Sequence, residues 1–320
     1  MLIERKAVVS LIESPDTDSH LRYRLQISRD VVAFAGALGL PAENAYDSYV
    51  QTGRDYLVWN VFAAPALELR LEESCFPIAG CVSYRGYFKP EDAEKRAALL
   101  RERGYDVYVS GVTAYSTLGW FNDPLLDTFL LGEEEYLAGL IFHELAHRIV
   151  YVKGDTRFNE SLATSVERFA LRKWLKSRGH HAAFDEYNAS LDRRDSVIKL
   201  INETRRQLKE IYTSAELDSR KLVIKSELIE QLVENYRVLA EQWTDGVGFS
   251  YWMDGEINNA KLETVADYNS WVPVMNTYLI THGMESFVLE MIRLASLQES
   301  ERHAILKSMP ILKELGNRTR

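Results

Sequence analysis

The most constraining stretch of the sequence runs from residue 137 to residue 160 and contains the pattern His-Glu-x-x-His. His143 and His147 are four residues apart, and side chains at this spacing lie one above the other on a helix of 3.6 residues per turn. Two imidazoles on one helix face can bind one metal ion. Glu160 follows after twelve intervening residues and is the candidate third ligand. The pattern therefore predicts a metal-binding helix followed by a second element that carries a carboxylate.

Two imidazoles and one carboxylate form the ligand set of catalytic rather than structural zinc, because the fourth tetrahedral position stays open for water. Glu144 directly follows His143 and would flank that water. Zinc lowers the pKa of bound water to about 7, and a neighbouring carboxylate can take the proton and pass it to a leaving amine. The chemistry implied is hydrolysis of an amide bond by a zinc-activated water, with Glu144 as general base and acid.

The residues alone are compatible with two alternatives to a zinc site. With 7 histidines and 47 acidic residues in the chain, chance supplies roughly 0.02 such patterns. The surrounding apolar residues recur at helical intervals, so the histidines could instead be hydrogen-bonded members of a buried core. A di-iron helix bundle also uses Glu-x-x-His, as in Glu144 and His147, but it needs a second such pair. No other histidine in the sequence has a glutamate three residues before it.

The composition narrows the classes of partner. The net charge is -9 and the basic residues are scattered, which argues against a nucleic-acid-binding surface. The sequence has no apolar run of the roughly 18 residues that a membrane helix requires, and its first sixteen residues lack the apolar core of a signal peptide. We therefore expect a peptide or protein substrate, no nucleic acid, and no transmembrane segment in this chain.

The order of predicted elements indicates an α+β fold. A helix is expected to end near Gly39, and another spans residues 90–103, with Pro90 at its start and Gly104 just past its end. Aromatic and β-branched residues predict strands over 56–63, 67–71, 81–88, 105–109 and 112–118. After Glu160 the chain is expected to be mainly helical, including a helical hairpin over 192–242 that breaks near 213–218. We expect a zincin-like catalytic region over 1–180, with a small mixed sheet beside the active-site helix, and a largely helical region over 181–320 that packs over the cleft.

Other residues are candidates for contacts around the metal. Tyr115 lies on the strand before the metal helix, so it could touch the substrate or its oxyanion, or it could simply be a packed aromatic. Tyr268, Asn258 or Asn259 could supply a neutral donor to the oxyanion, although adjacent asparagines at a helix start are usually caps. Glu167 shares a helix face with Glu160 and could hydrogen-bond a ligand histidine, or be a surface charge.

The two cysteines, Cys75 and Cys81, have five residues between them. They could be two small hydrophobic residues in a reduced core or could form a short-loop disulfide, and the spacing alone leaves both open.

The local segments His143 to His147 and Asn159 to Ala163, followed by Glu167, resemble the gluzincin zinc peptidases, particularly the large zinc aminopeptidases. A wider resemblance covers most of the chain. Six segments of the chain are similar to the bacterial family called predicted aminopeptidases. These segments are WNVFAAP, CFPIAGCVSYRGYF, AYSTLGWFNDP, IFHELAHRIVYV, DTRFNESLATSVE and INNAKL.

The resemblance implies that His143, His147 and Glu160 bind zinc and that Glu144 is the general base and acid. Two departures from the large aminopeptidases stand out. The spacing between His147 and Glu160 is shorter, so the connection must be compact, and the Gly-x-Met-Glu-Asn segment that holds a free N-terminus is missing from the sequence. The resemblance thus implies a zinc peptidase more firmly than an aminopeptidase. A zincin-fold protein that binds peptides or regulates without turnover is the alternative function.

The same family resembles bacterial envelope proteins that carry a lipoprotein-type signal. This implies a periplasmic or membrane-associated location, a lipid anchor in the full-length protein, and an oxidising compartment that favours a disulfide between Cys75 and Cys81. Without such a signal, the chain would be cytoplasmic.

Overall fold

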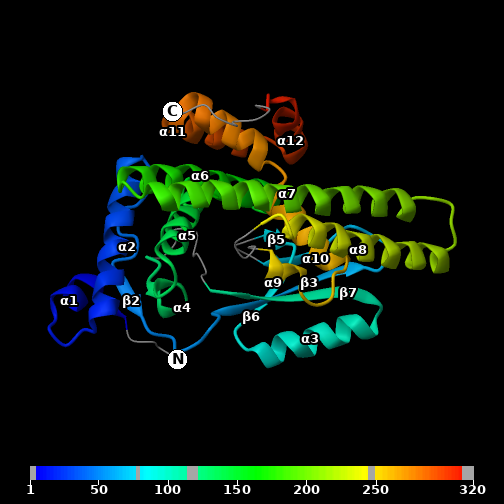
Figure 1. Ribbon diagram of the computed structural model, residues 1–320, viewed down its shortest axis with the longest axis horizontal. Helices are drawn as coiled ribbons and strands as arrows, with labels where there is room; N and C mark the ends of the chain where they lie inside the picture. The colour runs from blue at the N-terminus through cyan, green and yellow to red at the C-terminus, as the bar shows by residue number, and fades with distance from the viewer. Residues whose placement is uncertain (1–4, 77–79, 114–121, 244–248, 312–320) are drawn as a thin grey trace. The chain divides into compact units, whose positions relative to one another are not determined.

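The computed structural model describes residues 5–76, 80–113, 122–243 and 249–311. The chain divides into two compact units, each assembled from separate stretches. The first unit contains residues up to 57, residues 112–178 and the residues from 268 onward, and the second contains residues 58–111 and 179–267. Helices and small sheets occur together, which confirms the predicted α+β class (Figure 1). The predicted division at residue 180 partitions the chain differently and stays a prediction.

The first unit is mainly helical and contains one small sheet. In that sheet β2 pairs antiparallel with β1 and parallel with β8, with Tyr49 opposite Leu125. Asp18 caps the long helix α2 by accepting hydrogen bonds from the first-turn backbone. The elements are β1 (Lys6–Ala7), α1 (Val8–Glu13), α2 (Ser19–Ala37), β2 (Ser48–Val50), β8 (Leu125–Leu126), α4 (Asp127–Leu130), α5 (Glu134–His147), α6 (Thr156–Ser177), α11 (Val272–Ala295) and α12 (Glu299–Ser308).

Helix α6 is the centre of the first unit. It contacts α5 along one side and α11 along another (Figure 1). Three of the apolar residues that predicted a buried metal helix are fully enclosed, and so are three apolar residues of α6, the helix that packs on α5. Burying a leucine, isoleucine or phenylalanine side chain stabilises a fold by about 1.5–3 kcal/mol, so these residues fix the two helices against each other. They are Leu137, Ile141 and Leu145 of α5 and Phe158, Leu162 and Val166 of α6.

The second unit is built on a three-stranded sheet in the order β6-β3-β7. Alternate residues of β3 face opposite sides of the sheet, as the period of a strand requires. Val61 and Ala63 pack against α3, whereas Phe62 and Ala64 pack on the other face with residues of α10 and β7. The elements are β3 (Val58–Pro65), β4 (Ser74–Phe76), β5 (Gly80–Val82), β6 (Arg85–Tyr87), α3 (Pro90–Glu102), β7 (Tyr105–Val112), α7 (His181–Tyr212), α8 (Asp218–Ala240), α9 (Ser250–Met253) and α10 (Asn259–Asn269).

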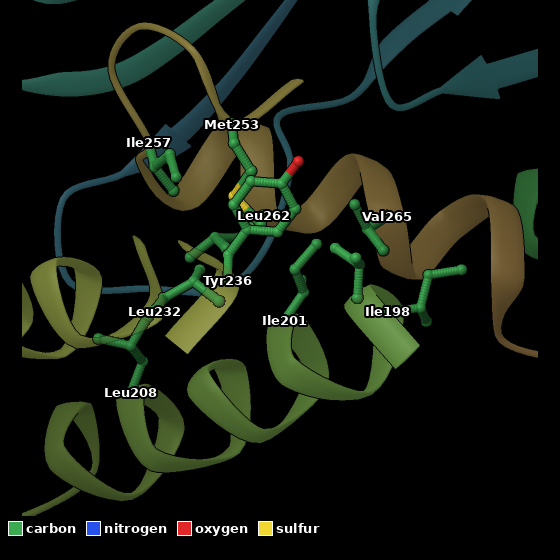
Figure 2. Close-up of a cluster of buried hydrophobic side chains, with 10 residues drawn as sticks. Ile198, Ile201, Leu208, Leu232, Tyr236, Met253, Ile257, Leu262 and Val265 are labelled. Carbon is green, nitrogen blue, oxygen red and sulfur yellow. The ribbon is translucent and has the colours of Figure 1, made fainter. Parts of the chain in front are cut away.

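The predicted helical hairpin is present in the second unit as α7 and α8. Its facing sides and the following α9 and α10 enclose an apolar cluster, whose labelled side chains point toward one another in Figure 2. Two partly buried ion pairs also hold this unit together. Arg205 of α7 donates to Glu263 of α10, with Nε 2.8 Å from Oε1, and Lys225 of α8 donates to Asp106 of β7.

The predicted strand over residues 67–71 is wrong. A turn follows Pro65, and residues 67–71 have no strand partner within the described part of the chain. The amide nitrogen Nδ2 of Asn259 lies 3.0–3.1 Å from the carbonyl oxygens of Pro65, Ala66 and Glu68. Because Asn259 is fully buried, it fixes these carbonyls in a turn, and an alternating apolar pattern cannot report such a distant contact.

Two other strand predictions are corrected in their extent. The predicted strand over 81–88 is divided between β5 and β6, and β7 covers 105–112 as a single strand. The remainder of the predicted strand over 112–118 lies outside the described residues.

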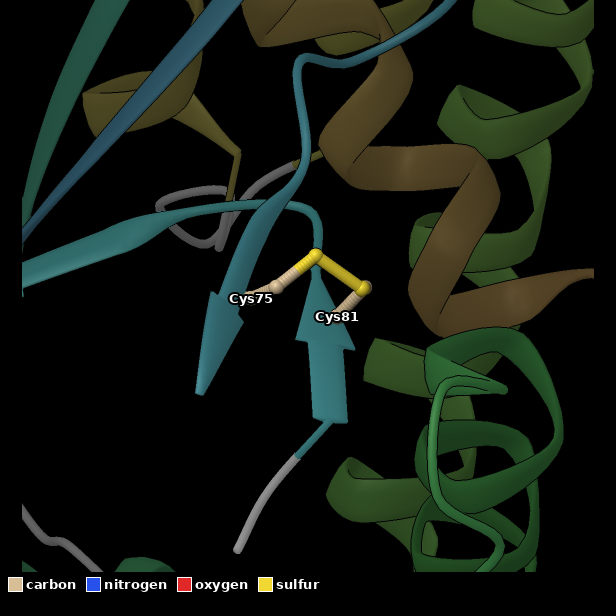
Figure 3. The surroundings of a disulfide bond; sticks show 2 residues. All are labelled: Cys75 and Cys81. Carbon is tan, nitrogen blue, oxygen red and sulfur yellow. A yellow bond between two sulfur atoms is a disulfide. The ribbon is translucent and has the colours of Figure 1, made fainter. Parts of the chain in front are cut away.

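Cys75 and Cys81 form a disulfide across the hairpin of β4 and β5 (Figure 3). The two residues are direct partners in the antiparallel register, with Cα atoms 3.8 Å apart. The structure therefore has the disulfide rather than the reduced pair. In the described part of the chain, we find no helix with both the length and the hydropathy of a membrane span.

Candidate metal centre

Helix α5 carries the two histidines of the motif in its last turns. The helix begins with Glu134 and Glu135, whose negative charges suit the positive end of the helix dipole. His143 and His147 lie on the same side of α5, and their ring centroids are 5.1 Å apart. The backbone of α5 therefore presents the two imidazoles as the four-residue spacing predicts.

Helix α6 brings Glu160 to the same place. Its Oε2 atom lies 3.4 Å from Nε2 of His143 and 3.8 Å from Nε2 of His147, and one donor atom from each of the three residues lies within 4.8 Å of the other two. Donors held tetrahedrally at about 2.0–2.2 Å from one ion are roughly 3.3–3.6 Å apart. The separation of 3.4 Å lies in this range and that of 3.8 Å is slightly longer, so small side-chain adjustments would let the three side chains hold a single metal ion.

Glu167 orients the first histidine. Its Oε2 atom lies 3.0 Å from Nδ1 of His143, so the predicted contact between Glu167 and a histidine of the motif is present. When Nδ1–H of His143 donates to this carboxylate, Nε2 is the nitrogen left to bind a cation.

Neighbouring charges in the site counteract the effect of burial on the pKa values of His143 and Glu160. Burial lowers the pKa of His143, but the hydrogen bonds and charges of Glu160 and Glu167 outweigh it and raise this pKa well above its usual 6.5. Burial lowers the pKa of His147 to about 4. Burial raises the pKa of Glu160, but the two histidines outweigh this effect and lower it. The pocket therefore favours one positive charge between its carboxylates, a charge that a metal cation also supplies.

The connection between α5 and α6 is compact, as the short spacing requires. Asn159 fixes it, because its Oδ1 accepts a hydrogen bond from the backbone N–H of Val152 and its Nδ2 donates to the carbonyl of the same residue, both at 2.8 Å. Asp155 caps α6 by accepting from the backbone N–H of Phe158 at 3.0 Å. Asn159, the residue before Glu160, thus fixes the loop, and Asp155 fixes the start of α6.

The structure places the remaining candidates unequally. Glu144 is half-buried on α5 beside His143. Tyr115 lies outside the described residues, and Tyr268 is in the last turn of α10 with a side chain that also lies outside them. Asn258 donates to the carbonyl of Val107 at 3.1 Å and caps α10. Asn258 and Asn259 therefore serve the packing of the second unit.

Tyr46 is a buried residue whose pKa responds to the charge of Glu144, and the sequence did not reveal it. Its side chain is buried and its backbone is left-handed, with φ 61°, a conformation that costs a non-glycine residue free energy and that concentrates at functional sites. Arg148, one turn beyond Glu144 on α5, donates to the carbonyl of Glu43 at 3.1 Å and so ties this loop to the helix. Burial, then the charges of Glu144 and Asp123, raise the pKa of Tyr46 well above 10, so the phenol stays protonated.

The comparison with protein families finds one match, and it spans both units. The model of the family described as "Putative aminopeptidase" matches residues 1–306. The chain belongs to this family. The membership supports peptidase activity, and the matched region of this aminopeptidase family member includes the three converging side chains, Glu144 and Tyr46. Neither the curated proteins nor the solved structures contain a match to the chain.

Proposed function

We propose that the protein is a zinc-dependent metallopeptidase of the gluzincin type, in which His143, His147 and Glu160 hold zinc and Glu144 is the general base and acid. The observation that carries this proposal is the convergence of two imidazoles and one carboxylate on one point, with Glu144 beside them on α5. This donor set leaves a position for water or substrate. Zinc, when bound, supplies a Lewis acid that lowers the pKa of water and polarises a carbonyl.

The side chains of the chain divide the remaining work. Glu144 takes a proton from the attacking water and returns it to the leaving amine, which converts a poor leaving group into a neutral one. Glu167 holds the ring of His143 in one orientation through the 3.0 Å contact to Nδ1. The family membership supports aminopeptidase action, in which cleavage begins at a free N-terminus.

The function is tested by metal content and by digestion of a peptide library. We expect about one zinc per chain by elemental analysis, cleavage of library peptides, loss of cleavage with a chelator, and its return with added zinc. Stepwise removal of N-terminal residues would support aminopeptidase action, and internal cuts would support an endopeptidase. A chain that is fully loaded with zinc but cleaves no peptide in the library would contradict the proposal and would point to a protein that only binds peptides.

Replacing Glu167 with glutamine should weaken zinc binding by about 10–100-fold, the usual effect of removing a carboxylate that orients a ligand histidine. The neutral amide keeps the shape of the side chain but not its charge, so the Nδ1 proton of His143 is held less firmly. Competition with a chromophoric chelator measures the affinity. Glu94→Gln, at an exposed carboxylate of α3, is the matched control, and an equal loss there would attribute the effect to net charge.

We infer that Tyr46 supplies the neutral hydrogen-bond donor that a tetrahedral oxyanion needs. Its buried phenol lies in a left-handed loop that Arg148 ties to the helix of the general base, and groups beside the general base are close to the reacting carbonyl. Tyr46→Phe should lower kcat for peptide cleavage by about 10²–10³-fold, the usual loss for one oxyanion donor. KM and zinc content should change little.

Tyr49→Phe is the control for this prediction. Tyr49 is buried to a similar degree in the same part of the chain, and its pKa is raised by burial and then by Asp127 rather than by Glu144. Equal losses of kcat in the two variants would mean that the hydroxyl of Tyr46 matters only for packing.

We further propose that the protein works in an oxidising compartment such as the periplasm or the membrane surface. The disulfide between Cys75 and Cys81 supports this location. Mass spectrometry after thiol labelling of the protein in its native cell measures whether the pair is oxidised. Fully labelled thiols would contradict this location.

A further inference from the structure

The largest fully buried side chain of the described residues is that of Arg302. It lies in α12, and its Nε and Nη2 atoms donate to one oxygen of Asp155, Oδ2, at 2.9 and 2.7 Å. Both side chains are almost completely enclosed, with 2% and 3% of their surfaces exposed. The pair joins the last described helix to the residue that begins α6.

Asp155 is the point at which several contacts meet. Its Oδ1 accepts the backbone N–H of Phe158, its Oδ2 also lies 2.9 Å from Nε2 of His303, and its carbonyl accepts the backbone N–H of Asn159 at 3.1 Å. All the acceptors of this residue are therefore used around the first turn of α6, immediately before Glu160. Arg302 in turn donates from Nη1 to the carbonyl of Leu297 at 2.9 Å.

A buried ion pair is weak evidence for stability, because the free energy of removing two charges from water offsets most of their attraction. The best-attested use of such pairs is to fix register, since the pair tolerates only one arrangement of the elements that carry it. Here the elements joined by the pair and its neighbours are α6, α12 and the C-terminal end of α11. The register that is fixed is the axial position of α6.

That position matters for the metal ligands. One residue along a helix is a rise of about 1.5 Å, and metal–ligand distances must be met within about 0.2 Å. Glu160 is five residues after Asp155, and its carboxylate lies 3.4 Å from Nε2 of His143. A shift or rotation of the first turn of α6 by a fraction of one residue would separate the carboxylate from the histidines.

We propose that Asp155 and Arg302 are positioning residues of the metal centre: the pair sets the axial position of α6, and so the place of Glu160 opposite the two histidines. This inference rests on the proposed function, because it assigns the pair to zinc binding. Through it, the C-terminal helix α12 becomes part of the support of a site whose ligands lie on α5 and α6.

The test compares zinc affinities of the full chain at a temperature where circular dichroism shows every variant folded. Arg302→Met should weaken zinc binding by about 10–100-fold, as measured by competition with a chromophoric chelator and without any substrate. Arg302→Lys keeps the charge but not the two hydrogen bonds from Nε and Nη2 to Oδ2 of Asp155, and should recover part of the affinity. His303→Gln removes a milder contact to Asp155 and should give a smaller loss in the same direction.

The chain offers a matched control in the second unit. Arg205→Met breaks the partly buried pair of Arg205 with Glu263, whose side chains are 20% and 2% exposed, and should lower the melting temperature without changing zinc affinity. Wild-type zinc affinity in Arg302→Met would overturn the inference. If that variant does not fold, unchanged affinity in both Arg302→Lys and His303→Gln would overturn it instead. A wild-type chain that binds no zinc would refute the proposed function itself, and the inference with it.

Discussion

Replacing Glu144 with glutamine is expected to lower kcat for peptide hydrolysis by about 10²–10⁴-fold, the usual contribution of a positioned general base and acid. The amide is nearly the same size as the carboxylate, so α5 and the rings of His143 and His147 should keep their places. An amide cannot accept the proton of the attacking water, nor return it to the leaving amine. The measurement is steady-state hydrolysis of a peptide that the wild-type protein cleaves.

Zinc content separates this effect from the loss of the site. Glu144 is not among the three converging donors, so Glu144→Gln should bind about as much zinc as the wild type. Glu135→Gln, at the first turn of the same helix, is the control for a lost charge on α5 and should remain active. A Glu144→Gln protein with wild-type activity would refute the assignment of the general base.

Replacing Glu160 with alanine is expected to weaken zinc binding by more than about 100-fold. Zinc sites with four protein ligands bind with about 10–16 kcal/mol, so one ligand carries roughly 3 kcal/mol, which is about a factor of 100 in the dissociation constant. Removal of the carboxylate also takes away a hydrogen-bonding and charged partner of His143. Chelator competition measures the loss, and peptide hydrolysis should fall with zinc occupancy.

Two further variants define the origin of this loss. Glu160→Gln keeps the shape of the side chain, so a large loss there would identify the charge as the important property. Glu227→Ala removes an exposed carboxylate of α8 and should leave zinc binding unchanged. Wild-type affinity in Glu160→Ala would remove this residue from the ligand set and would require a different third donor.

Most of what could be predicted from the sequence follows from the spacing of residues within a single helix. The four-residue separation of His143 and His147 and the apolar residues around them predicted a buried helix with both rings on one side, and α5 has this arrangement. The helical pattern around Glu160 and Glu167 predicted the shared face, and the contact of Glu167 with His143 follows from it. These features depend on helix geometry, which a short stretch of sequence is sufficient to determine.

Features that depend on distant contacts were not visible in the sequence. The alternation over residues 67–71 is typical of a strand, but the turn there is fixed by Asn259, which lies almost two hundred residues away and bonds Glu68 across a separation of 191 residues. Arg302 and Asp155 are separated by 147 residues. No periodic pattern links such residues, because nothing in either stretch specifies which partner it will meet.

Tyr46 was missed for a different reason. Its proposed role as a donor to the oxyanion depends on a left-handed backbone and on its closeness to Glu144. The residues around it have neither helical nor strand periodicity. A left-handed tyrosine has no reliable sequence signal, because glycine and asparagine are the residues usually expected there.

The two units alternate along the chain, and this has a consequence for the order in which they are completed during synthesis. The chain passes from one unit to the other after residues 57, 111, 178 and 267. All of the second unit is therefore translated before α11 and α12 of the first unit are made. His143, His147 and Glu160 are translated long before Arg302, so the proposed metal ligands are present in a growing chain that still lacks the helix bonded to the start of α6.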